Sequence, residues 1–115
     1  MGEITGEQII AKALKTQGVE HGFGVVGIPV GGLAGAMMKE GMTYHGMRHE
    51  MPATYAAQAV SYLSGNGGIG VALAVSGPGV LNAVGAYANA WSNRWPMLLL
   101  GGSYERSGHM QGFFQ

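Results

Sequence analysis

Residues 22–27 read GFGVVG, which matches the glycine pattern G-x-G-x-x-G of dinucleotide-binding proteins. Glu50 lies near the place where such proteins carry the acid that binds the ribose. The pattern has this meaning only where it follows a strand and opens a helix, because the pyrophosphate binds at the N-terminus of that helix. Here the first glycine comes straight after GVEH, which leaves no room for a strand, and Ile28 and Pro29 follow the last glycine. We therefore expect a short strand and a loop, and no NAD site.

A carboxylate and a glycine-rich turn are the other candidates for chemistry. Glu50 ends the stretch RHE, and the stretch SGPG at 76–79 follows an apolar run, where its glycines would let the backbone lie close to a flat ring. Each has a simpler interpretation, Glu50 as a solvated residue in the first turn of a helix and SGPG as a tight strand-to-helix connection. From the residue types alone, the simpler interpretation of Glu50 is favoured.

Histidines are the remaining candidates for metal ligands, because the sequence contains no cysteine and all six of its acidic residues are glutamate. His45 and His49 are four residues apart, but a strand-to-helix junction lies between them and Pro52 follows. They therefore cannot share one helical face as the histidines of H-E-x-x-H do. We expect no metal site in this sequence.

The composition indicates one domain with extensive contact surfaces. The chain has 115 residues, no net charge and only 10% charged residues, against about 25% in typical globular domains. This balance does not favour nucleic acid or an anionic membrane as partners, and no apolar run approaches the roughly 20 residues that span a bilayer. Without cysteine or an apolar N-terminal segment, a cytoplasmic protein is expected. The low charge predicts self-association or a partner domain.

Apolar periodicity predicts helices and strands in strict alternation. Thr5 and Gln8 fit a capping box, and Gly18 stands where the first helix should end. We expect helices at 5–17, 33–40, 53–63 and 80–92, and strands at 23–26, 43–47, 68–75 and 97–102.

This order predicts an α/β fold, an open parallel sheet with helices on both faces. Ligands of such folds bind at the carboxyl ends of the strands. Three junctions would lie there, with the sequences GIPVGG, RHEMP and SGPG.

Several stretches together resemble a known family, in order and in spacing. They read FGVVGIPV, YHGMRHEMPATYAAQAVSYLSG, VALAVSGPGVLNAV, NRWPMLLLGGSYER and GFFQ, and they cover nearly the whole chain. The chain resembles the N-terminal pyrimidine-binding domain of thiamine-diphosphate-dependent enzymes, and within it looks most like 2-hydroxyacyl-CoA lyase and oxalyl-CoA decarboxylase. The likeness to these two enzymes rests mainly on VVGIPV and GGSYER. Acetolactate synthases, by contrast, usually have a proline where Val26 stands.

The resemblance implies roles for particular residues. Glu50 would hydrogen-bond the aminopyrimidine ring of thiamine diphosphate and so activate the cofactor as its ylid. The turn SGPG would line the pyrimidine pocket, Ile28 would face the thiazolium side, and GFFQ would lie beside the substrate. The residues implied to bind the cofactor are Ser76, Gly77, Pro78, Gly79 and Ile28, and those implied to contact the substrate are Phe114 and Gln115. Asn82, one turn after SGPG, is a further candidate for cofactor binding, with an exposed helix residue as the alternative.

The resemblance also implies what this sequence does not supply. Related enzymes hold the diphosphate and Mg²⁺ on a second domain through a Gly-Asp-Gly stretch, and this sequence has no aspartate. We therefore expect residues 1–115 to be one pyrimidine-binding domain that is inactive or barely active alone. It would work as a homo-oligomer, dimer or tetramer, or in a complex with a diphosphate-binding domain, on an acyl-CoA substrate. The alternatives are a non-catalytic α/β oligomerisation module and an acetolactate-synthase-like carboligase domain.

Overall fold

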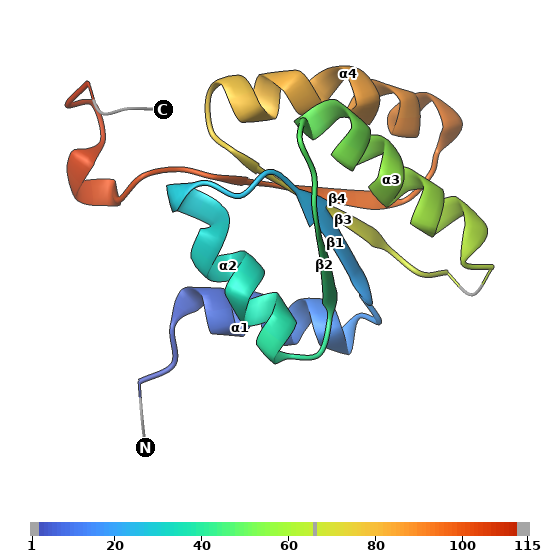
Figure 1. Ribbon diagram of the computed structural model, residues 1–115, viewed down its shortest axis with the longest axis horizontal. Coiled ribbons are helices and arrows are strands. Elements are labelled where there is room, and N and C mark those ends of the chain that lie inside the picture. The colour runs from blue at the N-terminus through green and yellow to red at the C-terminus, as the bar shows by residue number, and fades with distance from the viewer. Residues whose placement is uncertain (1–2, 66, 113–115) are drawn as a thin grey trace.

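In the part of the chain that the structure describes, four helices and four strands alternate, followed by one short 3-10 helix (Figure 1). The structure is a computed structural model that describes residues 3–65 and 67–112. The elements are α1 (Gly6–Thr16), β1 (His21–Gly24), α2 (Ile28–Lys39), β2 (Thr43–Gly46), α3 (Glu50–Leu63), β3 (Gly70–Val75), α4 (Pro78–Asn93), β4 (Met97–Gly102) and η1 (Arg106–Gly108).

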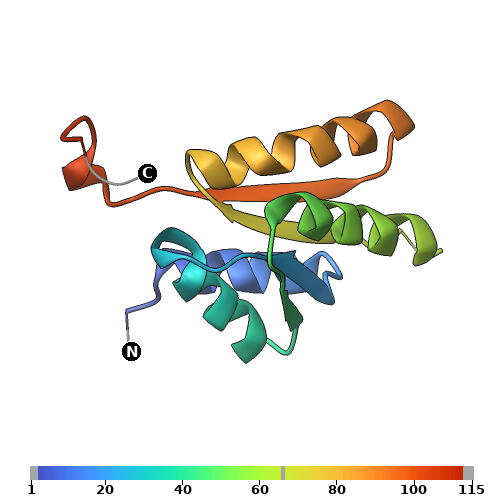
Figure 2. The same ribbon diagram turned by 45° about the horizontal axis from the view of Figure 1, so that its top comes forward.

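The strands form one parallel sheet in the order β2-β1-β3-β4. Helices α1 and α2 cover one face of the sheet, and α3 and α4 cover the other (Figure 2). This confirms the expected α/β fold with an open parallel sheet between two helical layers. Strand β3 lies inside the sheet and all six of its residues are buried, which is typical of a parallel strand covered on both faces.

The core is divided between the two faces of the sheet because successive side chains of a strand point to opposite sides. Val71 and Leu73 of β3 pack against α1 and α2, together with the fully buried Met37. Ala72 points the other way and packs with Phe23, Ala53 and Ala57. Small side chains on this second face let α3 approach the sheet closely.

The first helix begins and ends as its sequence predicts. The Thr5 side chain accepts a hydrogen bond from the Gln8 backbone N–H, and the Gln8 side chain accepts one from the Thr5 N–H, which completes the capping box. Gly18 follows the helix at a φ of +82°, a conformation that glycine adopts at little cost.

Three helices begin earlier than the apolar pattern predicts, by three to five residues at α2 and α3 and by two at α4. Proline explains two of these starts, since Pro29 and Pro78 lie in the first turn, where the missing N–H is not needed and the fixed φ suits a helix. At α3, His49 is the N-cap residue, and its Nδ1 accepts a hydrogen bond from the Met51 N–H at 3.2 Å.

The glycines of GFGVVG lie in a different context from the one we expected. Strand β1 spans His21–Gly24, so Gly22 lies inside the strand, whereas the first glycine of a dinucleotide fingerprint follows the strand. The expectation that no helix follows Gly27 is wrong, because Gly27 is the N-cap residue of α2. A Cβ at Gly22 would lie 2.7 Å from Met37 Cε, and one at Gly24 would overlap the Leu73 carbonyl oxygen. The overlap with backbone accounts for Gly24, whereas the neighbour of Gly22 is the flexible end of the Met37 side chain.

Candidate functional site

The residues that sequence reasoning singled out gather at the carboxyl edge of the sheet. Glu50 is the first residue of α3, soon after β2 ends, and the turn 76–79 joins β3 to α4. Ile28 begins α2 shortly after β1 ends. In Figure 1 the connections before these helices lie at the same edge of the sheet. This is where ligands of open α/β sheets bind.

Glu50 is buried although it lies in the first turn of a helix, with only 9% of its surface exposed. The helix macrodipole favours a carboxylate at this position. Its Oε2 accepts a hydrogen bond from Asn82 Nδ2 at 3.2 Å. Its Oε1 faces Gly79, where a Cβ would lie only 3.5 Å from that oxygen. The interpretation of Glu50 as a solvated surface residue does not fit this burial.

The turn SGPG has a backbone that needs glycine at two positions for different reasons. Gly77 has φ +67° and ψ −121°, which L side chains rarely adopt. A Cβ at Gly79 would lie 2.8 Å from Val75 Cγ2, so a side chain there would crowd the end of β3 and approach Glu50. The Ser76 N–H donates to the Gly102 carbonyl at 2.6 Å, which ties the turn to the end of β4.

Ile28 lies at the same edge but its side chain is 95% exposed. The preceding residue, Gly27, approaches β3 so closely that a Cβ there would lie 2.6 Å from Val75 Cγ1. The connection from β1 to α2 is therefore adjacent to the end of β3, and Ile28 projects from it. The predicted loop at Ile28 is instead the first turn of a helix.

The remaining sequence-based candidates lie at the site or outside the described residues. Asn82, a candidate cofactor contact, donates its side-chain amide to Glu50. The expected substrate residues, Phe114 and Gln115, lie outside the described residues. Sequence reasoning also missed His49 as the cap of α3, because histidine is not among the residues that usually mark an N-cap.

The histidines do not form a metal cluster within the described ranges 3–65 and 67–112. His21 and His45 come from the neighbouring strands β1 and β2, and their Nδ1 and Nε2 atoms are 3.2 Å apart, a hydrogen-bond distance. The His45 ring stacks on Phe23 with 4.6 Å between ring centroids. His49 caps α3 at the other side of the junction, so His45 and His49 share no helical face.

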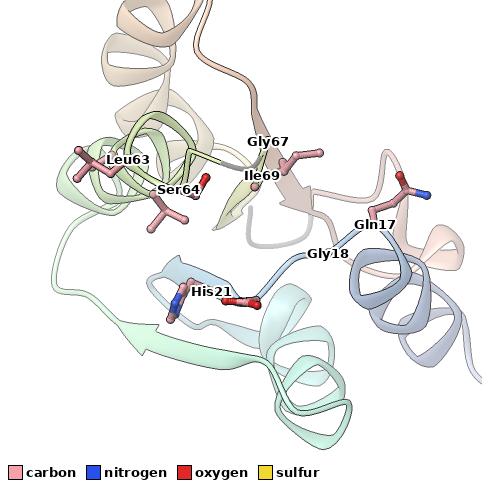
Figure 3. Close-up of a pocket in the computed structure, with 11 residues that line it drawn as sticks. Gln17, Gly18, His21, Leu63, Ser64, Gly67 and Ile69 are labelled. Carbon is pink, nitrogen blue, oxygen red and sulfur yellow. The ribbon is translucent and has the colours of Figure 1, made fainter.

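A cavity of about 450 Å³ lies at the opposite, amino edge of the sheet (Figure 3). It opens between the end of α1, the end of α3 and the start of β1, and none of Glu50, Gly79 and Asn82 lines it. This cavity is therefore separate from the candidate site at the carboxyl edge of the sheet. The lining residues are Gln17, Gly18, Glu20, His21, Ala59, Val60, Leu63, Ser64, Gly67, Gly68 and Ile69.

Comparison with known proteins identifies the family. A family model described as "Thiamine pyrophosphate enzyme, N-terminal TPP binding domain" matches residues 4–115. This chain belongs to that family. Thiamine pyrophosphate, also called thiamine diphosphate, is the cofactor of the family, as the sequence resemblance implies. None of the helices in the described part of the chain is long and apolar enough to cross a membrane.

Comparison with individual curated proteins shows which members of the family the chain resembles. The chain is 52% identical to 2-hydroxyacyl-CoA lyase 1 of Mus musculus, over 98% of the chain and 19% of the relative. It is 44% identical to 2-hydroxyacyl-CoA lyase of Arabidopsis thaliana, over 97% of the chain and 19% of the relative. It is 45% identical to oxalyl-CoA decarboxylase of Escherichia coli K12, over 89% of the chain and 18% of the relative. The chain thus spans about a fifth of the length of these relatives.

The residues at the carboxyl edge fit an aminopyrimidine ring. The Glu50 carboxylate is buried and one of its oxygens faces Gly79, while the other is held by Asn82. A Cβ at Gly79 would be in ordinary contact with this oxygen, 3.5 Å away, and would clash with Val75 Cγ2, so the backbone of the turn lies close to the carboxylate. A flat ring with a nitrogen near Glu50 Oε1 satisfies both features, because it needs little thickness and one hydrogen-bonding partner.

Proposed function

We propose that this domain binds the pyrimidine end of thiamine diphosphate in a lyase or decarboxylase that acts on 2-hydroxyacyl-CoA or oxalyl-CoA thioesters. Membership of the family and 44–52% identity to the 2-hydroxyacyl-CoA lyases above support this substrate class. The observation that carries the proposal is the buried Glu50 carboxylate, which faces Gly79 of the turn SGPG.

Each residue of the site has a defined task in this proposal. Glu50 Oε1 holds a proton at the ring nitrogen of the aminopyrimidine, and burial keeps competing water away. Gly77, Pro78 and Gly79 let the backbone approach one face of the ring, while Ser76 fixes the turn to β4. Ile28 provides an apolar contact on the thiazolium side. When bound, the cofactor supplies a thiazolium ring that adds to a carbonyl carbon and accepts the electron pair of the breaking carbon–carbon bond.

The rest of the protein's activity requires groups from outside this domain. The chain has no aspartate, and we propose that Mg²⁺ and the diphosphate bind to a separate domain, in the same protein or in a partner. We also propose that the protein is cytoplasmic and homo-oligomeric, and that Phe114 and Gln115 contact the substrate. Residues 1–115 then act as a single pyrimidine-binding domain.

The decisive experiment substitutes Glu50 in a complex that also supplies the diphosphate-binding domain. Glu50→Gln keeps the size and the Asn82 contact but removes the carboxylate, and cleavage of a 2-hydroxyacyl-CoA should fall by about 10²- to 10⁴-fold. Glu20→Gln, an exposed glutamate at the amino edge, is the matched control and should leave turnover unchanged. Near-normal turnover of Glu50→Gln would refute the proposal.

A non-catalytic assembly module is the second candidate, because α3 and α4 expose large apolar side chains such as Leu81 and Trp91. Titration with thiamine diphosphate, with and without Mg²⁺, separates the two. For an assembly module, the cofactor should not change the melting temperature. The proposed function predicts protection against thermal unfolding in the complex that includes the diphosphate-binding domain.

A further inference from the structure

Asn82 contacts the functional carboxylate directly, and this contact assigns it a task. We propose that Asn82 is a positioning residue, which holds Glu50 Oε2 so that Oε1 is the oxygen presented to the aminopyrimidine ring. The inference rests on the proposed function of Glu50. It replaces the sequence-based expectation that Asn82 itself binds the cofactor.

The geometry distinguishes the two oxygens of Glu50. Asn82 Nδ2 lies 3.2 Å from Oε2, whereas Oε1 faces Gly79. A carboxylate group is symmetric and rotates about its last torsion, so without a donor on one side either oxygen could take either place. One hydrogen bond from a fixed donor removes this freedom, because rotation would then break the bond.

An amide suits this position better than a charged donor. Lysine or arginine would pair with the carboxylate and compete with the ring nitrogen for it. The asparagine amide donates through Nδ2 to Oε2, which accepts a hydrogen bond both in the ionised carboxylate and when the proton lies on Oε1. Asn82 can therefore keep its contact whether or not Glu50 carries the proton.

The helices that carry the two residues are held in register further along. Gln58 of α3 is 99% buried, its Nε2 donates to the Ala86 carbonyl of α4 at 2.5 Å, and its Oε1 accepts from Asn89 Nδ2 at 2.8 Å. Ala86 lies one turn beyond Asn82, and Gln58 lies two turns beyond Glu50. Asn82 is thus presented by a helix that cannot slide along α3 without breaking buried hydrogen bonds.

The surroundings of Asn82 indicate that folding alone does not require it. Asn82 is exposed on α4, and asparagine is a weaker helix former than alanine. Substitution there should leave the fold intact. This makes Asn82 suitable for separating a positioning role from a structural one.

The test measures turnover and cofactor affinity separately in the cofactor-loaded complex. In Asn82→Ala and the isosteric Asn82→Asp, kcat should fall by about 10- to 100-fold, because a misplaced catalytic group costs about this much. The cofactor dissociation constant should change by less than about threefold, since the proposal gives Asn82 no contact with the ring. Asn93→Ala, which removes an exposed amide further along α4, is the matched control and should change neither.

Double variants decide whether Asn82 acts through Glu50. In the Glu50→Gln background, Asn82→Ala should lower kcat no further, because residues that act as a unit are not additive. In the cofactor-free chain, the shifts in urea midpoint of Glu50→Ala and Asn82→Ala should likewise be non-additive.

Other outcomes overturn the inference in distinguishable ways. Full turnover of Asn82→Ala together with an inactive Glu50→Gln would refute positioning and leave the proposed function standing. A large loss of cofactor affinity in Asn82→Ala, or additive effects in the double variants, would also refute positioning. If Glu50→Gln itself is fully active, the proposed function fails and this inference fails with it.

Discussion

Single close contacts decide which glycines of the chain are replaceable. A Cβ at Gly24 would overlap the Leu73 carbonyl oxygen and lie 2.8 Å from Tyr44 Oη, so the backbone of β3 would have to move. Gly46 pairs with Gly24 across β1 and β2, and a Cβ there would meet nothing within 4 Å. Gly24 is buried in the inner strand β1, whereas Gly46 is exposed at the end of the edge strand β2.

We predict that Gly24→Ala destabilises the chain by about 1–3 kcal/mol through overpacking. Gly46→Ala should be neutral or stabilising, because alanine has less freedom to lose on folding. Urea denaturation of both variants measures the difference. If NADH protects the wild type and Gly24→Ala removes that protection with an unchanged melting temperature, GFGVVG is a nucleotide site after all.

Tyr44 gives a second residue-scale prediction, at alkaline pH. Its buried hydroxyl has no hydrogen-bond partner in the described part of the chain, and burial raises its pKa above the ordinary value, about 10. Above this pH the unfolded chain loses the proton while the folded chain retains it, so stability falls as pH rises.

Tyr44→Phe should remove the contribution of Tyr44 to the loss of folding stability at alkaline pH. At pH 7 the variant should be as stable as the wild type or slightly more so, because an unsatisfied buried hydroxyl is removed. Melting temperatures from pH 7 to pH 11 test both statements. An identical alkaline decline in the two proteins would show that Tyr44 does not contribute to it.

The pairing of α3 and α4 is the element-scale feature that presents Asn82 to Glu50. Buried Gln58 links the helices through Ala86 and Asn89. Helices α3 and α4 also contact each other along their length, and the Gln58 hydrogen bonds fix their register at this level.

We predict that Gln58→Leu destabilises the chain by about 1–3 kcal/mol, because it removes both hydrogen bonds of the buried Gln58 amide and leaves Asn89 Nδ2 without that acceptor. Gln17→Leu, at the exposed end of α1, is the matched control and should have little effect. Urea denaturation measures both. If Gln58→Leu is as stable as the wild type, apolar packing alone sets the register of the two helices.

The alternation of elements could be predicted from sequence because apolar periodicity reports burial, and β3, with six apolar or small residues in a row, is buried throughout. The starts of the helices could not be predicted in the same way, because Pro29 and Pro78 look like loop residues until their place in a first turn is known. The need for glycine at position 27 could not be predicted either. The φ of Gly27, −145°, is open to any residue, and the glycine is explained by its closeness to Val75.

The location of the candidate site could be predicted from the sequence, but not all of its contacts. Parallel topology places Glu50, Gly79 and Ile28 at one edge, and the sequence order implies this topology. The contact of Asn82 with Glu50 could not be foreseen, because it joins residues 32 apart and depends on how α4 crosses α3.

At the scale of the whole molecule, α3 and α4 carry several exposed large apolar side chains. Tyr62, Leu63, Leu81 and Trp91 are each 62–77% exposed. Scattered apolar residues are normal on surfaces, but large ones concentrated on two neighbouring helices mark contact sites. The low charge of the chain points the same way.

We predict that the chain self-associates at micromolar concentration, and that Trp91→Glu weakens association by placing a charge in the contact. Met38→Glu, on the exposed side of α2, is the control, since this half-exposed side chain lies on the other face of the sheet. Sedimentation measures the mass. A wild type that sediments only as an 11.9 kDa monomer would contradict the prediction.

In the proposed function, Glu50 is the group that activates the cofactor. Exchange of the proton on the thiazolium carbon with solvent deuterium measures this activation without any substrate. In the complex with the diphosphate-binding domain, wild-type protein should accelerate this exchange strongly over free thiamine diphosphate. Glu50→Gln should slow the exchange by at least about 100-fold while the cofactor stays bound. Exchange at the wild-type rate in cofactor-loaded Glu50→Gln would contradict the account.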